Sequence, residues 1–154
     1  TADDSAALVC LAKTLFLTHH ARRINTSLGD ATGLSGLGIH LIEVEPGCDT
    51  TETHVHYCED EAVYVLSGTA IAAIGDSTHE IKEGDFIGYR KGGAAHNIRA
   101  TGSEVFRVLV IGQRLDHDVA DYTDAKKRIF RNKGLPWDLA DQDALTHPQA
   151  GAKK

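Results

Sequence analysis

Two histidines flank a single valine in the stretch GCDTTETHVHYCEDEAVYVLSG, residues 47–68. Because successive side chains of a β-strand point to opposite faces, His54 and His56 are expected to project toward the same side of a sheet. Glu61 follows the turn-like segment YCED and is expected to open the next strand of a hairpin, facing the same interior. His96 heads a later strand-like segment, HNIRA, after the glycine-containing turn KGGAA.

Three imidazoles and one carboxylate that converge in a small interior make a candidate site for a divalent metal. Neutral imidazole suits Zn, Fe, Ni or Cu, and a carboxylate adds the oxygen that harder ions such as Mn prefer. Four protein ligands on an octahedral ion leave two positions for water, substrate or dioxygen. The pattern therefore predicts that His54, His56, Glu61 and His96 bind one ion, which is Zn, Fe(II), Mn or Ni.

Other interpretations of these residues stay open at this stage. Glu59 and Asp60 are rival carboxylates, but both fall in the predicted turn. A histidine pair of this spacing is also common on protein surfaces, where it binds nothing. The presence of His96 and the strand-turn-strand order of the segments favour the metal site over a surface histidine pair.

The elements that must position these side chains are short and resemble β-strands. Each is rich in β-branched or aromatic residues and is bounded by Gly, Asp, Ser or Pro. Short strands separated by turn signals every 8–12 residues or so are typical of an all-β sandwich or barrel. No alternation of strands with long helices is present, which argues against a parallel α/β sheet. The segments are LGIHLIEVEPG, EAVYVLSG, TAIAAIGD, THEIKEGD, FIGYRKGG, HNIRA and EVFRVLVIG.

Two of these stretches carry a family resemblance. HVHYCEDEAVYVLSG resembles the first motif of the cupin superfamily, with His54, His56, Glu61 and Gly68 at the family's spacing, and GDFIGYRKGGAAHN resembles the second motif, which ends in His96. The resemblance implies an all-β fold, the double-stranded β-helix or jelly-roll barrel, with a central metal and often a homodimer. It does not imply one reaction, because cupins include dioxygenases, sugar isomerases, decarboxylases and binding modules.

The resemblance covers residues 37–112, so residues 1–36 and 113–154 are predicted to be extensions of the barrel. The apolar run LVCLAKTLFL, residues 8–17, contains a lysine and is too short to span a bilayer, which predicts buried structure. After Gly112 the sequence turns polar. We expect one or two short helices there, with Phe130 and Trp137 pinning the segment to the barrel or to a partner subunit. The last ten or so residues are predicted to be disordered.

Composition limits the partners of the chain. The 154 residues carry a formal net charge of -6 with acids spread along the sequence, which argues against a nucleic-acid partner. Three cysteines without a CxxC pair suit a reducing compartment, so we expect a cytoplasmic protein that does not enter a membrane. The predicted function is metal-dependent chemistry on a small molecule. The alternative is a non-catalytic cupin module that binds or senses a small ligand.

Three further polar residues are interpreted from their places in the predicted strands. Arg107 interrupts an apolar strand and is either a buried anion-binding group or one half of an ion pair at the sheet edge. His40 shares its strand face with Ile42, which favours a core histidine. Tyr64 is out of phase with Glu61 and is expected to face away from the interior.

Overall fold

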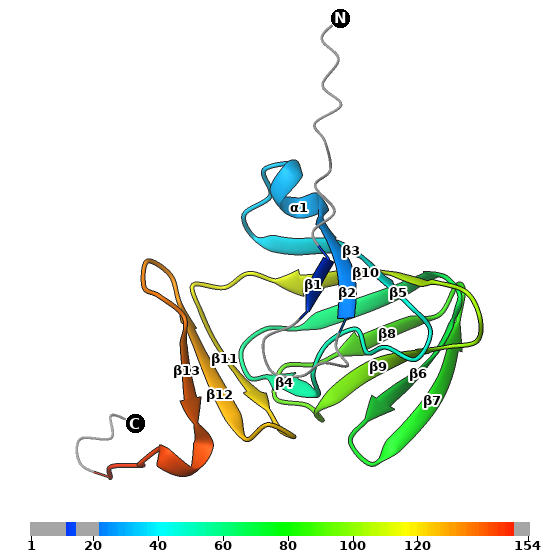
Figure 1. The fold of residues 1–154 in the computed structure, drawn as a ribbon. Helices are drawn as coiled ribbons and strands as arrows, with labels where there is room; N and C mark the ends of the chain where they lie inside the picture. Colours follow the sequence, from blue (N-terminus) through cyan, green and yellow to red (C-terminus); the bar gives the residue numbers. More distant parts are fainter. Residues whose placement is uncertain (1–11, 15–21, 150–154) are drawn as a thin grey trace, which may run out of the picture.

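The structure is a computed structural model that describes residues 12–14 and 22–149. Most of the apolar run at residues 8–17 therefore lies outside the described residues. The described chain forms two antiparallel sheets, one short helix, α1 (Leu28–Ala31), and a 3-10 turn, Gln142–Ala144 (Figure 1). This arrangement confirms the predicted all-β class.

The two sheets are built from strands that are distant in sequence. The first sheet has the order β1 (Ala12–Thr14), β2 (Arg22–Ser27), β3 (Leu37–Val44), β10 (Phe106–Gln113), β5 (Glu61–Ser67) and β8 (Phe86–Tyr89). The second has the order β13 (Asp138–Asp141), β12 (Lys127–Asn132), β11 (His117–Tyr122), β4 (His54–His56), β9 (His96–Thr101), β6 (Thr69–Ile74) and β7 (Ser77–Lys82).

The apolar core lies between the inner faces of the two sheets. Along β5, Val63 and Val65 are buried whereas Tyr64 is 41% exposed, which is the period-two alternation of a strand with one face in the core. Phe106 on β10 is fully buried in the same cluster. Burial of these side chains removes apolar surface from water, which is the main favourable contribution to folding.

One row of residues crosses the inner face of the first sheet and includes the predicted metal ligand Glu61. Gly112 on β10 pairs with Gly38 on β3 on one side and with Glu61 on β5 on the other. Glu61 in turn pairs with Tyr89 on β8. Directly paired residues of antiparallel strands share a face, so all four line the interior, and two of them have no side chain.

The prediction of one or two short helices after Gly112 is met only by the 3-10 turn Gln142–Ala144, and the rest of the described C-terminal extension forms three strands instead. β11 pairs with β4, which places Ala120 opposite His56 and Tyr122 opposite His54. The extension therefore continues the second sheet (Figure 1). Charged residues on these strands hide the strand pattern in the sequence. Several of them have their counter-charge on the neighbouring strand, as in the pairs Asp118–Arg131, Asp121–Arg128 and Lys127–Asp141.

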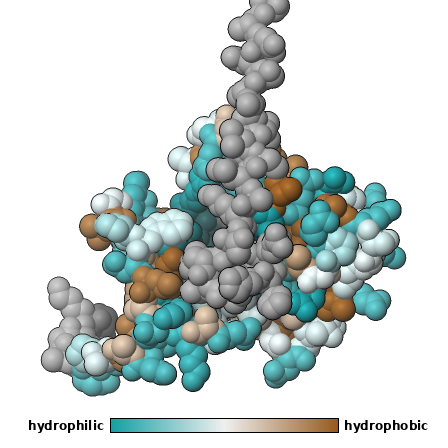
Figure 2. All heavy atoms as spheres, viewed as in Figure 1, coloured by the Kyte–Doolittle hydropathy of each residue, from teal (hydrophilic) through white to brown (hydrophobic). Residues whose placement is uncertain are grey.

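The predicted anchors of this extension are only partly inserted. Trp137 is 65% exposed and lies under the guanidinium of Arg131, at 5.3 Å from the ring centroid, while Phe130 is half-buried on β12. On the face shown in Figure 2, hydrophilic side chains predominate and apolar ones gather only in small groups. Across the described ranges, no helix is long and apolar enough to cross a membrane.

Candidate metal centre

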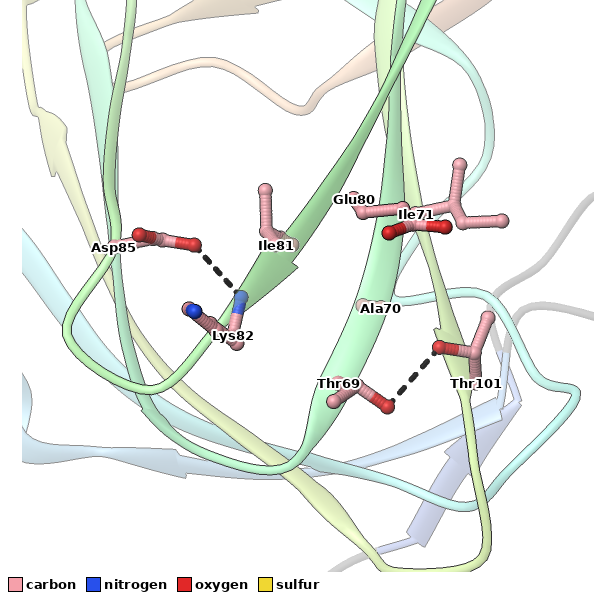
Figure 3. Close-up of a pocket in the computed structure, with 8 residues that line it drawn as sticks. All are labelled: Thr69, Ala70, Ile71, Glu80, Ile81, Lys82, Asp85 and Thr101. Atoms are coloured by element: carbon pink, nitrogen blue, oxygen red, sulfur yellow. Dashed lines mark hydrogen bonds between the residues drawn. The ribbon is translucent and has the colours of Figure 1, made fainter.

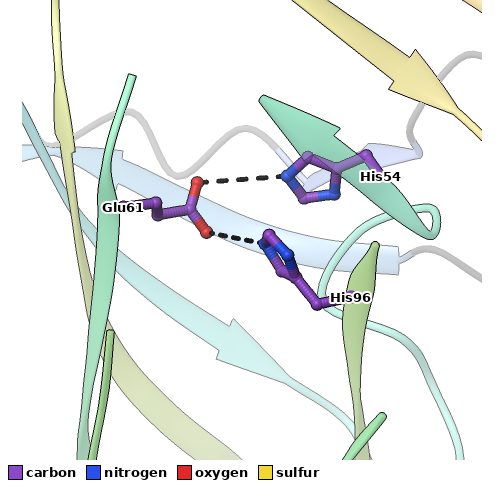
Figure 4. Close-up of side chains that lie close together, drawn as sticks. All are labelled: His54, Glu61 and His96. Carbon is purple, nitrogen blue, oxygen red and sulfur yellow. Dashed lines mark ion pairs between the residues drawn. The ribbon is translucent and has the colours of Figure 1, made fainter. Parts of the chain in front are cut away.

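The fold brings the four predicted ligands together. His54 and His56 come from β4, His96 from the start of β9, and Glu61 from the start of β5 on the opposite sheet. The Glu61 carboxylate lies 4.0 Å from His54 Nε2, 3.9 Å from His56 Nε2 and 3.7 Å from His96 Nε2. Figure 4 shows His54 and His96 turned toward Glu61 across the space between the sheets. The carboxylate is thus the common neighbour of all three rings.

The Nδ1 atom of each imidazole lies close to a hydrogen-bond acceptor, which orients the ring. His54 Nδ1 lies 2.9 Å from the carbonyl oxygen of Glu52, and His96 Nδ1 lies 3.2 Å from that of Ala94. His56 Nδ1 lies 2.7 Å from a carboxylate oxygen of Asp118. Acceptors at Nδ1 favour the tautomer that carries its proton there, so each Nε2 keeps a free lone pair toward Glu61. Metal-binding histidines are oriented in the same way in metalloproteins.

Electrostatics also prepare the interior for a cation. Burial raises the pKa of the Glu61 carboxyl, but the neighbouring imidazoles of His54 and His96 outweigh burial and hold that pKa below its usual value. Burial lowers the pKa of His54, while the Glu61 carboxylate more than offsets this and raises it. The site therefore keeps a buried negative charge, and a bound cation would take the place of the proton that this charge attracts.

Tyr89 completes the wall beside His96. The two rings stack with centroids 3.6 Å apart and planes 4° apart, which fixes the plane of the imidazole. The Tyr89 hydroxyl is buried and has no hydrogen-bond partner within the described part of the chain. Burial, followed by the charge of Glu61, raises the pKa of Tyr89, so its hydroxyl stays protonated at neutral pH.

A second cluster behind His56 has the composition of a metal site but is already occupied by a side chain. His56, Glu59 and Asp118 bring potential ligand atoms within 4.8 Å of one another. The guanidinium of Arg131 binds both Glu59 and Asp118 through Nη2. Leu115 N donates to the other Glu59 oxygen at 2.8 Å. An arginine therefore supplies the positive charge here, and the cluster supports His56 rather than binding an ion.

The residues of the interior fit a divalent ion. His54, Glu61 and His96 have ligand atoms that all lie within 4.8 Å of one another. An ion with bonds of about 2.1 Å to each ligand requires pairs of ligand atoms no more than about 4.2 Å apart, and the 3.7–4.0 Å separations from Glu61 meet that limit. His96 Nε2 is also buried without a hydrogen-bond partner among the described residues, which leaves its lone pair for a metal.

Comparison with known proteins identifies the family. The cupin domain family matches residues 40–112, a range that contains all four candidate ligands. The crystal structure of a "Putative sugar phosphate isomerase" from Acidithiobacillus ferrooxidans is 45% identical, covers 97% of this chain and 95% of its own, and superposes with a TM-score of 0.86. The chain is a cupin. The predicted jelly-roll barrel is therefore confirmed.

Two further solved structures are similar to this chain over a smaller share of its length. A "sugar phosphate isomerase from a cupin superfamily" from Silicibacter pomeroyi is 26% identical, covers 82% of this chain and 81% of its own, and has a TM-score of 0.75. A "predicted oxalate decarboxylase" from Thermotoga maritima is 22% identical over 61% of this chain and 80% of its own, with a TM-score of 0.52, and shows the fold alone. No curated protein matches the sequence.

The rival and ambiguous residues of the sequence now have definite places. Glu59 is buried but turned to Arg131, and Asp60 is exposed and accepts a hydrogen bond from Lys91 N at 2.8 Å. Arg107 forms an ion pair with Glu43 at 2.6 Å on the outer face of the sheet, so the predicted ion pair is present, but it joins the inner strands β10 and β3 rather than lying at the sheet edge. The prediction that Tyr64 faces away from the interior is confirmed.

Sequence reasoning missed the residues that hold His56 in place. Asp118 is 1% exposed, and Arg131 is its direct cross-strand partner in the β11–β12 pairing. Neither residue stands in a recognisable motif. A buried acid in a polar segment becomes visible only when the strand register is known.

The cavity drawn in Figure 3 lies away from the histidines. It has a volume of about 430 Å³ and is lined by residues of β6, β7 and β9, with Asp85 from the turn after β7. Its row, in which Thr69 pairs with Thr101, is five residues along β9 from His96. At about 3.4 Å per residue this is roughly 17 Å. The cavity therefore belongs to the opposite end of the barrel.

Proposed function

We propose that this cupin binds one divalent metal ion through His54, His56, Glu61 and His96 and uses it to isomerise a small phosphorylated sugar. The observation that carries the metal site is the set of three Nε2 atoms around one carboxylate, each ring held by an acceptor at Nδ1. The names of the two most similar structures described above support the substrate class.

Each residue of the site has a separate task in this proposal. The three imidazoles would bind the ion as neutral ligands through Nε2, and Glu61 would bind as the carboxylate. When bound, the ion supplies Lewis-acid polarisation of a substrate carbonyl or hydroxyl. The Tyr89 hydroxyl, which keeps its proton, donates a hydrogen bond to the substrate oxygen that gains negative charge. Val63, buried next to the site on β5, keeps water from the interior.

The metal content of the purified protein tests the metal site. We expect about one ion per chain by elemental analysis of untagged parent protein, and loss of that ion in His56→Ala. His79→Ala is the matched control, because His79 is exposed on β7 and contacts none of the four residues. Parent protein that takes up no added Zn, Fe, Mn or Ni contradicts the proposal.

The reaction is tested separately on metal-loaded protein. In heavy water, an isomerase that shifts a proton between adjacent carbons incorporates deuterium into a sugar phosphate, which NMR detects. Incorporation that requires the metal supports the enzyme. Tight binding of the sugar phosphate without exchange supports the alternative, a non-catalytic binding module.

Four further properties remain predictions. Which of Zn, Fe(II), Mn and Ni is bound has to be measured in protein from cells. The affinities of a protein site for divalent metals follow the same general order in most proteins, so affinity alone does not identify the ion. A homodimer is expected and is measured by light scattering. The cytoplasmic location and the barrel limits at residues 37 and 112 are also expectations from sequence.

A further inference from the structure

The outer faces of the two sheets differ in polarity, and the second sheet has the ordinary kind. Its outward row across β7, β6 and β9 consists of Glu80, Ile71 and Arg99, which are direct cross-strand partners. An apolar residue between two charged ones is typical of a sheet face that meets water. The outer face of the second sheet therefore needs no covering.

On the first sheet, the corresponding outward row is apolar throughout. It runs across β3, β10, β5 and β8 through Leu41, Leu109, Tyr64 and Phe86, each of which pairs directly with the next. Tyr64 is 41% exposed and Phe86 is 64% exposed. The strands LGIHLIEV, EAVYVLS and FRVLVIGQ are thus apolar on both faces. Strands of this kind are typical of sheets that are buried on both sides.

Neighbouring rows enlarge this apolar surface. Leu66 lies two residues beyond Tyr64 on the same side of β5, and Leu37 and Ile111 lie on the same side of β3 and β10. Continuous exposed apolar surface of this kind marks an interaction site in a soluble protein. We call it the outer apolar face, and its members are Leu37, Leu41, Tyr64, Leu66, Phe86, Leu109 and Ile111.

A hollow of about 390 Å³ lies on the outer apolar face where two small residues meet. Ala62 on β5 pairs directly with Gly88 on β8 and with Ile111 on β10, so all three share the outward side. A Cβ built on Gly88 would meet only Phe86 Cε1, at 3.9 Å. None of the three candidate histidine ligands is among the residues that line the hollow. The hollow thus offers space for an apolar side chain from outside.

The charged residues at the two ends of the outer apolar face are balanced. Arg107 is paired with Glu43 at one end, and Asp60 and Arg90 line the hollow at the other. Two acids and two arginines cancel, although the whole chain carries a formal net charge of -6. Such a rim does not repel a second copy of itself, because like charges do not dominate it. A nucleic acid or an anionic membrane would instead require a surplus of positive charge.

We propose that the outer apolar face is the interface of a homodimer and is covered by the same face of a second copy. A two-fold dimer brings one patch against its own copy, so the patch has to be complementary to itself. An apolar centre with a balanced rim meets this requirement, and the hollow over Ala62 and Gly88 receives an apolar side chain of the partner. The candidate metal ligand Glu61 points to the inner side of the same sheet, so dimer and metal site are independent.

Light scattering of the full chain over a dilution series tests the interface. The parent is expected to have the mass of two chains, and Phe86→Lys to dissociate at about tenfold higher concentration or more, since dimerisation would bury the new charge. Ile71→Lys is the matched control, because it makes the same change at a 38% exposed side chain on the outer face of the second sheet. A parent with the mass of one chain, or equal dissociation of the two variants, overturns the proposal.

Two additional measurements sharpen the test. Ala62→Trp fills the hollow from within its own chain and is expected to weaken the dimer without introducing a charge; an unchanged or tighter dimer counts against the interface. Removal of metal by a chelator is expected to leave the dimer mass unchanged, because the ligands lie on the inner side of the sheet. Dissociation on metal removal would place the metal at the contact between copies and overturn the proposal, whereas metal content itself judges the proposed function.

Discussion

β11 and β12 carry two cross-strand pairs of aspartate and arginine that look alike but serve different neighbours. Asp118 pairs with Arg131 and Asp121 with Arg128, in direct register on the same two strands. The aspartates are 1% and 5% exposed. Because they are three residues apart, their side chains point to opposite faces of the sheet. Asp118 shares its face with the histidines of β4, while Asp121 shares the opposite face with Val55.

The contacts of the two pairs follow from these faces. Asp118 accepts from His56 and, through its other oxygen, from Cys58 N at 3.2 Å, and its arginine also binds Glu59. Asp121 accepts a bidentate pair of hydrogen bonds from Arg128, at 2.7 and 2.8 Å, and a further hydrogen bond from the Tyr57 hydroxyl at 2.7 Å. The first pair is joined to a candidate ligand and the second only to the sheet. Both lie beyond the residues 40–112 that match the family, so the extension contributes directly to the site.

The largest expected difference between the pairs comes from removing each arginine. Arg131→Met leaves Asp118 and Glu59 buried without their cation, which is expected to cost about 3–5 kcal/mol of unfolding free energy. Arg128→Met leaves only the carboxylate of Asp121 without its cation, and that carboxylate still accepts a hydrogen bond from the Tyr57 hydroxyl. The loss of unfolding free energy should therefore be clearly smaller. Urea unfolding measures both. Equal losses would show that the network around His56 is no more demanding than the other pair.

The second difference concerns the metal. Asp118→Asn removes the charge behind His56 Nδ1 and is expected to weaken metal binding about 10–100-fold, as loss of such outer partners does in metalloproteins. Asp121→Asn removes the same charge from the same strand and should leave metal affinity unchanged, since Asp121 contacts no candidate ligand. Competition with a chromophoric chelator measures both affinities. The comparison fails if the two variants lose metal equally.

The sequence predicted the candidate metal ligands but not the aspartate–arginine pairs of the extension. The stretches HVH and EAVYV alternate strictly, so strand period placed His54, His56 and Glu61 on one interior, and the structure brings them together. The extension has no such alternation. In DVADY and KRIF the apolar residues are adjacent, because both faces of these strands carry charge pairs, and the pattern therefore suggested polar helices.

The two interpretations of Arg107 show the same limit. Arg107 stood out because it interrupts an apolar strand, yet its side chain points outward to Glu43. The register that places Gly38 beside Gly112 and Glu61 involves three segments that are far apart in the sequence. Such cross-strand rows depend on long-range pairing, which local pattern does not specify.

The smallest expected effect is the pH dependence of the pair that only supports the sheet. Hydrogen bonding to Arg128 lowers the pKa of Asp121 from 3.8 to about 2. A carboxyl whose pKa is lower in the folded state stabilises the protein above its unfolded pKa and loses this contribution as the pH falls through the folded value. The pair should therefore contribute at most about 2 kcal/mol near pH 7, and this contribution should fade between about pH 4 and pH 2.

The pH dependence is measured as a difference between two proteins, because other carboxyls titrate in the same range. Unfolding free energies of the parent and of Asp121→Asn should differ most near neutral pH and converge toward pH 2, with metal removed from both by a chelator. Removing the metal confines the comparison to the ion pair, since the candidate ligands then titrate alike in both proteins. A difference that is constant from pH 7 to pH 2 would mean that the carboxylate charge of Asp121 does not stabilise the sheet, and that its packing and hydrogen bonds alone account for its burial.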